Sequence, residues 1–490
     1  MTPHADRTTA TLGMTTSTCG TCLSLVPAKI TSNGNDVYLE KFCPSHGEER
    51  VRIRGDLNNY LETLRVVKPA WMPNSFAGDA HRGCPDGCGF CENHEQHLCM
   101  PIVEITNRCD LACPVCLTSS GCGTGSAVKP KDLSAAAFRI MLDRLLQAEK
   151  QVDVLNLSGG EPLLHPDILA LIDAAVSRKE IVRVSISTNG LPLLANPALL
   201  ESLRERNVVI SLQFDGFDEK AYEVLRGRRL LSEKQAVLKR LQDADVTTSL
   251  TMTVARDVNA DQFPRVLDYL FDARNVVSLM IQPVAFCGRG ASLAGKAGRI
   301  DIPEIVRLLG AAGHPAVRSR DFVPLPCSHP LCFSLAFYLM LEDGGTASFN
   351  GLVNASTMLD SLSNRVFFGL DPEEHAKVKA LIYDLWSGPA GAVPDSDAVL
   401  KTLREILRGM SEVSPCGCFD AKKAFTTNER RVKSIFIHAF QDSGTFDLDR
   451  ARRCCQAYPQ EDGRLLPACV RNVIHGRDRN MASVAHRGIV

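Results

Sequence analysis

Three cysteines in residues 104–116 constrain the fold and chemistry of this chain more than any other feature, because their C-x3-C-x2-C spacing places three thiolates on one short loop. Cys109, Cys113 and Cys116 can hold three irons of a [4Fe–4S] cube and leave the fourth iron open for a small chelating ligand. Residues 101–106, just before them, read as a short apolar strand. A strand running into a ligand loop is how an α/β barrel places its chemistry. Taken alone, the triad would also fit a zinc site or buried structural thiols.

A glycine pair behind the triad favours the cluster interpretation. Gly159 and Gly160 follow residues 152–157, which read as a second strand. Such a pair lets the backbone approach a ligand closely, and Glu161 offers a carboxylate to an ammonium group. A Gly-Gly-Glu-Pro motif is weak evidence by itself. At this distance behind the cysteines it strongly disfavours both zinc and structural thiols.

Strand-like and helix-like segments alternate from about residue 101 to 320, which indicates a mainly parallel sheet with crossover helices. The predicted strands are 102–106, 152–157, 182–187, 208–214, 247–254 and 276–282. The predicted helices are 135–148, 166–177, 196–206, 218–225, 233–244 and 260–273. This order predicts an α/β fold, a partial (β/α)6 barrel open on one side, with ligand groups at the carboxyl ends of the strands.

Polar residues follow several of these strands. Ser187 and Asn189 end the third strand and could meet a polar ligand. Ser211 or Asp215, in the segment that ends the fourth strand, could bind ribose hydroxyls, and the segment around Gln282, which ends the sixth, could contact an adenine ring. The alternative is that these are ordinary turn and cap residues.

Nineteen cysteines in a chain that we expect to be cytoplasmic argue for metal sites, since cytosolic thiols are kept reduced. Residues 1 to about 14 are expected to be a mobile tail. A metal ribbon follows, with Cys19, Cys22 and Cys43 as ligands and with His46 and Cys99 competing for the fourth position. Further along, Cys84, Cys88, Cys91 and then Cys99 repeat the triad spacing, and we favour an auxiliary iron–sulfur cluster there over zinc.

Beyond about residue 321 the alternation ends. Another cluster could be closed by Cys327, Cys332 and two of the late cysteines. The late cysteines are Cys416, Cys418, Cys454, Cys455 and Cys469, and of these we choose Cys455 and Cys469 as the ligands. A zinc site and buried free thiols are the alternatives. Phe333, Phe337 and Tyr338 are expected in the core rather than against substrate. The resulting domain plan is 1–99, 100–320 and 321–490, with cysteine-rich metal-binding regions flanking the barrel.

The charge and the apolar content of the sequence limit the kinds of binding partner that we expect. A formal net charge of −1 gives no reason to expect capture of nucleic acid or of an anionic membrane. The N-terminus lacks the plan of a signal peptide, and the longest apolar run, 331–341, is too short to span a bilayer. We therefore expect a cytoplasmic protein without a transmembrane span, for which peripheral membrane contact stays open.

The chain resembles the radical S-adenosylmethionine (SAM) superfamily over roughly 100–320, through the cysteine triad, the Gly-Gly-Glu-Pro motif and Ser187-Thr188-Asn189-Gly190. Its flanks are similar to a narrower group, the archaeal tetraether lipid synthases and the proteins linked to methylation of methanopterin precursors. The flanking motifs that carry this resemblance are Cys19-x2-Cys22 with Cys43-Pro-Ser-His46-Gly47, Gly83-Cys84-Pro-Asp-Gly-Cys88-Gly-Phe-Cys91, Pro326-Cys327-Ser-His329-Pro-Leu-Cys332, and Arg453-Cys454-Cys455 leading to Cys469.

The resemblance implies a [4Fe–4S] cluster with an open iron, SAM, auxiliary iron–sulfur clusters, and a rubredoxin-like iron or zinc. It also implies reductive cleavage of SAM to a 5′-deoxyadenosyl radical, with the backbone near Gly159–Glu161 fixing the amino group and a ferredoxin or flavodoxin supplying the electron. Coupling of lipid chains is the first expectation, and methylation of a pterin-like small molecule is the second. A non-catalytic metal-binding interaction protein is the alternative from another class.

Overall fold

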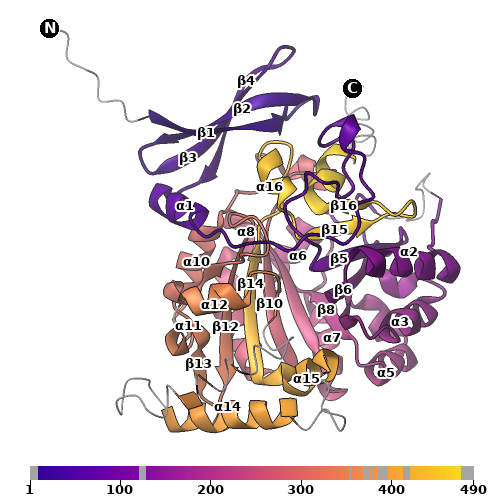
Figure 1. Cartoon of the computed structure of the whole chain (residues 1–490). Helices are drawn as coiled ribbons and strands as arrows, with labels where there is room; N and C mark the ends of the chain where they lie inside the picture. The colour runs from indigo at the N-terminus through magenta and orange to yellow at the C-terminus, as the bar shows by residue number, and fades with distance from the viewer. Residues whose placement is uncertain are drawn as a thin grey trace.

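The computed structural model describes residues 9–120, 129–353, 355–367, 376, 380, 382–383, 396–411 and 420–475. Within these ranges twelve strands belong to one mixed sheet, and four strands form a separate antiparallel sheet. Figure 1 shows the small sheet above one end of the barrel formed by the large sheet. Cys122, Cys416 and Cys418 lie outside the described residues.

Six parallel strands in chain order form the centre of the large sheet. They are β5 (Met100–Thr106), β6 (Val152–Gly159), β7 (Ile181–Thr188), β8 (Val209–Gln213), β9 (Thr248–Val254) and β10 (Val276–Pro283). The helices that connect them are α2 (Ala135–Ala148), α3 (Ile168–Val176), α4 (Leu191–Ala195), α5 (Pro197–Glu205), α6 (Glu219–Arg226), α7 (Leu231–Asp243), α8 (Arg256–Asn259) and α9 (Phe263–Asp272). The predicted partial (β/α)6 barrel is confirmed.

The two faces of these strands carry different side chains. Leu155, Ile186 and Leu250, fully buried, belong to the main apolar core, together with residues of the covering helices such as Phe138 and Leu142. Alternate positions carry small polar side chains, among them Ser185, Ser211 and Ser249, which line a cavity. Because strand side chains alternate between faces, one face packs the helices while the other leaves the barrel hollow.

Residues beyond 321 extend the barrel sheet at both edges. β14 (Val432–His438) runs parallel to β10 and antiparallel to β12 (Phe333–Met340), which also pairs β11 (Val323–Pro324) and β13 (Thr346–Ser348). At the other edge β15 (Gln456–Pro459) runs parallel to β5 and pairs β16 (Leu465–Pro467). The change of pattern near 321 is thus a change of topology within one continuous sheet. Pairing covers the edges of the six-stranded core, which would otherwise be open.

Among the described residues, the α-helices that follow β10 are α10 (Ile302–Ala311), α11 (Phe349–Leu352), α12 (Ala355–Ser361), α14 (Ser396–Ser411), α15 (Ala421–Asn428) and α16 (Leu448–Arg452). α14 and α15 lie at the end of the barrel opposite the small sheet (Figure 1). Within the described ranges, every helix is too short or too polar to cross a bilayer.

The small sheet holds β1 (Thr9–Thr18), β2 (Leu25–Asn33), β3 (Asp36–Cys43) and β4 (Gly47–Arg54), followed by α1 (Leu57–Leu64). The expected mobile tail is wrong for residues 9–14, because β1 pairs β2 from Thr9 onward. Thr15 Oγ1 donates to Asp447 Oδ1 at 2.6 Å, and Thr18 Oγ1 donates to the Ser443 carbonyl at 2.9 Å. The ribbon is therefore attached to the C-terminal part of the chain.

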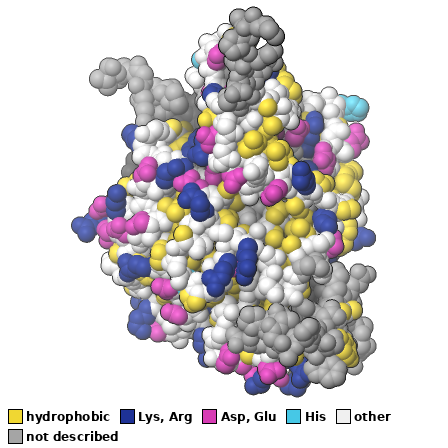
Figure 2. Space-filling view, turned by 90° about the vertical axis from the view of Figure 1, so that its left-hand side faces the viewer, with side chains coloured by type: hydrophobic (Ala, Val, Ile, Leu, Met, Phe, Trp, Pro, Cys, Tyr) yellow, Lys and Arg dark blue, Asp and Glu magenta, His cyan; other side chains and the backbone are white. Residues whose placement is uncertain are grey.

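Basic and acidic side chains are interspersed over the face shown in Figure 2, and neither sign dominates there. This distribution agrees with the near-zero net charge.

Candidate functional site

The loop that carries the cysteine triad leaves β5 and is held by Arg289, which follows β10. The Arg289 side chain donates to the carbonyl oxygens of Cys113 (2.9 Å) and Ser120 (2.6 Å), and its backbone N–H donates to the carbonyl of Cys116 (3.0 Å). All three thiols of the triad are partly buried. Burial raises the pKa of the Cys109 thiol to about 12 and also raises the pKa of Cys113. A bound metal centre would stabilise these groups as thiolates.

The triad is not arranged around one metal ion. Among the described residues, two sets of three or more possible ligand atoms lie within 4.8 Å of one another, and the triad is neither of them. A tetrahedral ion with metal–sulfur bonds of about 2.3 Å needs its sulfurs only about 3.8 Å apart. A cube holds each thiolate on a different iron. The three separated thiols on one loop therefore fit a [4Fe–4S] cluster.

Gly159 and Gly160 pack against the backbone that leads into this loop. A Cβ on Gly159 would lie 2.1 Å from the Thr106 carbonyl oxygen, and one on Gly160 would lie 1.9 Å from that of Arg108. The N–H groups of Gly160 and Glu161 donate to the same two carbonyls at 2.8 and 2.6 Å. The glycine pair was expected to let the backbone approach another group closely. That group is the backbone at the start of the cysteine loop, where any side chain on the pair would collide.

The Glu161 carboxylate is 1% exposed and is used inside the protein. It accepts hydrogen bonds from Thr188 Oγ1 (2.7 Å), from Asn189 N (2.7 Å) and from Leu163 N (3.1 Å). Burial raises its pKa to about 7 in spite of these bonds. The predicted contact of this side chain with an ammonium group is therefore corrected: the carboxylate joins the ends of β6 and β7.

Asn189 connects that carboxylate to the cysteine loop. Its side chain donates to Asp110 Oδ1 at 2.6 Å, next to Cys109, and accepts from Leu191 N at 2.8 Å. The fully buried Lys234 donates to the Asn189 carbonyl (2.5 Å) and to Gln213 Oε1 (2.7 Å). Burial lowers the pKa of Lys234 to about 8. Asn189 thus holds the loop, with its own groups committed to protein contacts.

Asp215 does not face a ligand, and its predicted contact with ribose is wrong. The residue is 0% exposed. Its two oxygens accept from Arg226 Nε (2.6 Å) and Nη2 (2.8 Å), from Gln213 Nε2 (2.5 Å) and from Thr253 N (3.0 Å). Arg226 also reaches the Cys113 thiol. Asp215 is the buried counter-ion of an arginine that borders the cysteine loop.

Ser187, Ser211 and Gln282 do face open space. They line a cavity of about 440 Å³ inside the barrel, which we call the lumen. The lumen runs from Leu117 and Thr118 of the cysteine loop to the buried ion pair Arg183–Glu429 (2.7 Å) at the other end. One wall carries hydroxyl groups of consecutive strands. The other wall carries aromatic rings, namely Phe337, Phe349, Phe367, Phe425, Phe436, Phe440 and Tyr458.

Asn156 and Phe337 are examples of lumen residues that were not predicted from the sequence. Asn156 on β6 accepts from Ser185 Oγ (3.0 Å) and Ser187 Oγ (3.1 Å), so it orders the hydroxyl wall. Its alternation with Val154 and Ser158 along β6 could have indicated an inward position. Phe333, Phe337 and Tyr338 are buried in the core as expected, and Phe337 also lines the lumen.

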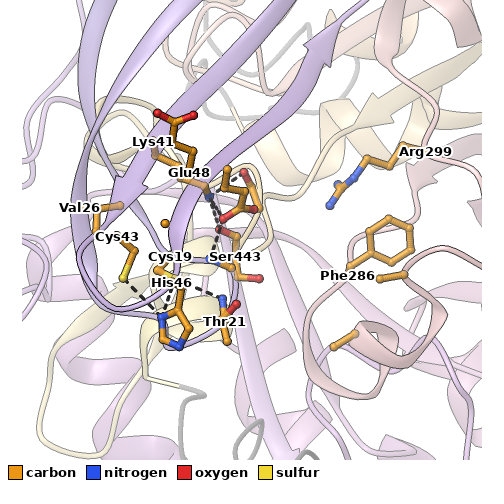
Figure 3. A pocket seen from close by; sticks show the side chains of 16 residues that line it. Cys19, Thr21, Val26, Lys41, Cys43, His46, Glu48, Phe286, Arg299 and Ser443 are labelled. Atoms are coloured by element: carbon orange, nitrogen blue, oxygen red, sulfur yellow. Dashed lines mark hydrogen bonds and ion pairs between the residues drawn. The ribbon is translucent and has the colours of Figure 1, made fainter.

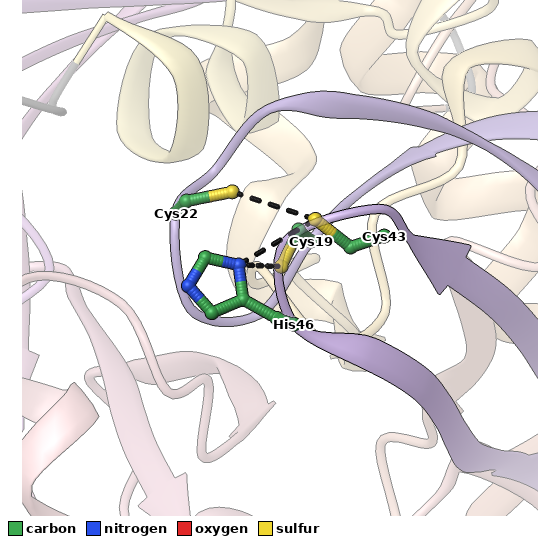
Figure 4. A group of neighbouring side chains, drawn as sticks. All are labelled: Cys19, Cys22, Cys43 and His46. Atoms are coloured by element: carbon green, nitrogen blue, oxygen red, sulfur yellow. Dashed lines mark hydrogen bonds between the residues drawn. The ribbon is translucent and has the colours of Figure 1, made fainter.

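The ribbon brings Cys19, Cys22, Cys43 and His46 together, as Figure 4 shows. His46 Nδ1 lies 3.6 Å from Cys19 Sγ and 3.5 Å from Cys43 Sγ, and the sulfurs of Cys22 and Cys43 are 3.8 Å apart. Tetrahedral zinc, with bonds of about 2.3 Å to sulfur and 2.0–2.1 Å to nitrogen, requires about 3.8 Å between sulfurs and about 3.6 Å between sulfur and nitrogen. These four residues fit one tetrahedral ion, and His46 rather than Cys99 stands in the fourth position.

A cavity of about 350 Å³ adjoins this site and separates it from the barrel (Figure 3). Lys41, 5% exposed, closes one side by donating to the carbonyls of Thr18 (2.6 Å) and Ser443 (2.9 Å). Phe286 and Arg299 of the barrel face it from the other side. The four ribbon ligands thus lie at an interface between two parts of the chain.

Two groups form among the remaining predicted ligands. Cys84, Cys88 and Cys91 line one small cavity with His94 and Arg452. Cys99, Cys327 and Cys455 are fully buried and lie within 4.8 Å of one another, so Cys327 and Cys455 meet Cys99.

Cys332 and Cys469 are not members of that group, and the predicted cluster of both with Cys327 and Cys455 is corrected. Cys332 Sγ accepts from Arg450 Nε and Nη2, both at 3.4 Å, and Cys469 Sγ accepts from Gln441 N at 3.3 Å.

Comparison with known proteins identifies the barrel. Residues 103–270 match the family model of the radical SAM superfamily. The chain belongs to the radical SAM superfamily. It is therefore an enzyme, and its cofactors are a [4Fe–4S] cluster and SAM. The predicted superfamily, fold class and cofactors are confirmed, and the non-catalytic interpretation is wrong.

Residues 11–55 match the model of the HMPTM N-terminal zinc ribbon domain. The whole chain is similar to 7,8-dihydro-6-hydroxymethylpterin dimethyltransferase of Methanocaldococcus jannaschii, with 26% identity covering 95% of this chain and 94% of that protein. It is also similar to mycofactocin maturase MftC of Mycolicibacterium smegmatis, with 30% identity over 41% of this chain and 49% of MftC. The solved structure of Streptococcus suis SuiB bound to precursor peptide SuiA superposes with a TM-score of 0.36 at 17% identity, covering 44% of this chain and 45% of SuiB.

Proposed function

We propose that this radical SAM enzyme methylates an unactivated carbon of a pterin-like heterocycle. The observation that carries this proposal is the end-to-end similarity to a pterin dimethyltransferase, which includes the ribbon as well as the barrel. The lumen supports it. Hydroxyl groups on one wall can pair with the edge of a polar ring, and aromatic side chains on the other can stack on its face.

The chain's own residues position the reactants. Together, the bound cluster and SAM supply an electron and a carbon radical that can remove hydrogen from an unactivated carbon. Cys109, Cys113 and Cys116 would hold the cluster, and the backbone around Gly159 would meet the amino group of SAM. Ser187, Ser211 and Gln282 would contact SAM or the substrate from the lumen wall, which holds reacting atoms close together and excludes water.

The coupling of lipid chains is a second candidate, because the lumen continues past the hydroxyl groups. Toward its far end the lumen is lined by Phe367, Phe425 and Val432, which would contact a hydrocarbon chain, beside the ion pair of Arg183 and Glu429. We infer that either substrate is reached from the cytoplasm, with a ferredoxin or flavodoxin as the electron donor.

The test is anaerobic incubation of the reconstituted enzyme with SAM, a reductant and 6-hydroxymethyl-7,8-dihydropterin, followed by mass spectrometry. We expect 5′-deoxyadenosine and S-adenosylhomocysteine together with a pterin that has gained methyl groups, because one SAM molecule would supply the radical and a second SAM molecule the methyl group. Formation of 5′-deoxyadenosine with an unchanged pterin would contradict the proposal. If a deletion strain then lacked a lipid equal to two joined chains, the second candidate would replace the first.

A further inference from the structure

Gln456 places a primary amide in the wall of the lumen, at the start of β15. Along this strand Gln456 and Tyr458 line the lumen, while Ala457 between them belongs to the main apolar core. Such alternation is that of a strand with one face toward the cavity. The side chain of Gln456 therefore points into the lumen.

This amide has no strong hydrogen-bond partner among the described residues. Gln456 is 7% exposed, and its Oε1 is buried without a donor. Its Nε2 donates to the thioether sulfur of Met100 at 3.9 Å, and such a sulfur is a weak acceptor. A buried polar group without a good hydrogen bond is unfavourable, so a partner for the amide is expected from outside the protein wall.

Other polar side chains of the lumen are paired with one another across neighbouring strands. The hydroxyl oxygens of Ser211 and Thr251 lie 3.0 Å apart, and Ser278 Oγ donates to Ser249 Oγ at 2.6 Å. These groups have partners before any ligand binds. The amide of Gln456 belongs to none of these pairs, which makes it available to a ligand.

Gln456 lies at the end of the lumen that is remote from the cysteine loop. It is in register with Met100, the first residue of β5, in a parallel pair of strands. Thr106, the last residue of β5, leads into the cysteine loop. The seven residues of β5, at about 3.3 Å each, span roughly 20 Å. SAM held at the cysteine loop would fill the near end, and the far end is left for the substrate.

We propose that Gln456 recognises the lactam edge of the substrate ring and so determines specificity for a pterin-like heterocycle. A primary amide presents a donor and an acceptor side by side. The pyrimidine ring of a pterin presents N3–H next to C4=O, so two hydrogen bonds can form together. Phe440 and Tyr458 line the same cavity and can contact the ring. This inference rests on the proposed function, because it assigns a further contact to the same substrate.

Two other occupants of this end of the lumen differ in their match to the amide. A hydrocarbon chain has no hydrogen-bonding group, so it would leave Gln456 buried and unpaired. An adenine ring can pair with a glutamine amide. Adenine would be brought here by SAM, and the affinity for SAM therefore distinguishes this case from a pterin.

The test compares the unaltered enzyme with Gln456→Met, which keeps the length of the side chain and removes both hydrogen-bonding groups. Each reconstituted enzyme is titrated with 6-hydroxymethyl-7,8-dihydropterin in the absence of reductant, and binding is followed by the fluorescence of the pterin. We expect the affinity to fall about tenfold or more in Gln456→Met, with an unchanged affinity for SAM. Gln147→Met, at an exposed glutamine of α2, is the matched control and should bind the pterin normally.

The stability of the ligand-free enzyme separates recognition from a structural role. Because the amide lacks a strong partner in the protein, Gln456→Met should keep or raise the denaturation midpoint. The pterin should raise the midpoint of the unaltered enzyme, and it should raise that of the variant less.

A pterin methylated at N3 tests the same contact from the side of the ligand, because it lacks the N3–H. The unaltered enzyme should bind it about tenfold more weakly than the parent pterin, and this preference should shrink in Gln456→Met. Equal affinities of the unaltered enzyme for the two pterins would contradict the lactam contact. This comparison keeps the test decisive if Gln456→Met does not fold.

Three results with the variant would overturn the proposal. If Gln456→Met bound and methylated the pterin as the unaltered enzyme does, the contact would be wrong and the proposed function would stand. A weaker affinity for SAM would assign the amide to adenine. A loss of iron that parallels the loss of pterin binding would make Gln456 a support of the neighbouring Cys455. An unaltered enzyme that neither binds nor modifies the pterin would refute the proposed function, and this assignment with it.

Discussion

In the ribbon, four ligand atoms lie against one another, while in the barrel the three cysteines of one loop stay apart. The ribbon ligands come from two turns of one small sheet, and their spacing of 3.5 to 3.8 Å is that of a single tetrahedral ion. The barrel cysteines are held through the backbone by Arg289 and through a network of buried charges from β6, β7 and β8. Three cysteines are present in each region, yet the two regions are arranged for different metal centres. Local turns suffice for one ion, whereas a cluster that must accept a ligand is supported by the whole barrel mouth.

The largest expected effect comes from removing one cysteine of the barrel loop. Cys113→Ala should reduce formation of 5′-deoxyadenosine to background, because the cluster would lose one of its three ligands. Metal analysis should show a loss of iron with the ribbon metal retained. Persistent 5′-deoxyadenosine formation in this variant would remove the assignment of Cys113, and parallel loss of both metals would end the distinction between the two sites.

The ribbon site should respond to its ligands with little effect on the cluster. His46→Ala should lose the ribbon metal or bind it about tenfold or more weakly, while His46→Cys should keep it, since sulfur can replace the imidazole in a tetrahedral site. Inductively coupled plasma mass spectrometry measures both metals. His81→Ala, at an exposed histidine, is the control and should keep its full metal content. Equal metal contents of His46→Ala and the control would show that His46 is not a ligand.

Sequence patterns located the six barrel strands to within two residues at every end, because each is an apolar run bounded by turn residues. Residues 276–282 were predicted for β10, which spans Val276–Pro283. β14 was not predicted, although it pairs with β10. The strand Val432–His438 lies about 150 residues further along, and nothing local in its sequence specifies that partner.

The site residues also fall into those that the sequence predicts and those that only the fold reveals. The cysteine triad and the ribbon ligands could be named from the sequence, because spacing alone brings them onto one loop or one pair of turns. Asp215 could not be interpreted, because its role depends on Arg226, which fills the space where a ligand was expected. Likewise, Cys327 and Cys332 are five positions apart, but only the fold shows that Cys327 joins Cys99 and Cys455.

The buried ion pair of Asp215 and Arg226, beside the cysteine loop of the barrel, tests whether buried charges support that loop. Asp215→Asn should destabilise the protein by about 3–5 kcal/mol, because it leaves Arg226 buried without its counter-ion. Glu201→Gln, which removes the exposed partner of Arg204, should leave the stability almost unchanged, because solvent screens an exposed pair. Denaturant unfolding of both variants measures the difference. Wild-type stability of Asp215→Asn with a weakened affinity for SAM would restore the ribose contact that the geometry denies.

The smallest expected effect is a pH dependence that the ribbon should not share. Burial raises the pKa of Glu161 to about 7 from an ordinary 4.5, so between these values the folded protein binds a proton that the unfolded chain releases. Stability from this group is therefore greatest at low pH and falls as pH rises through about 7. The denaturation midpoint should accordingly rise between pH 7.5 and about 6, and Glu161→Gln should flatten that rise, since an amide cannot titrate. Glu201→Gln changes an exposed carboxylate, so its denaturation midpoint should depend on pH as that of the unaltered protein does. If the midpoint of Glu161→Gln also kept that pH dependence, another group would titrate in this range.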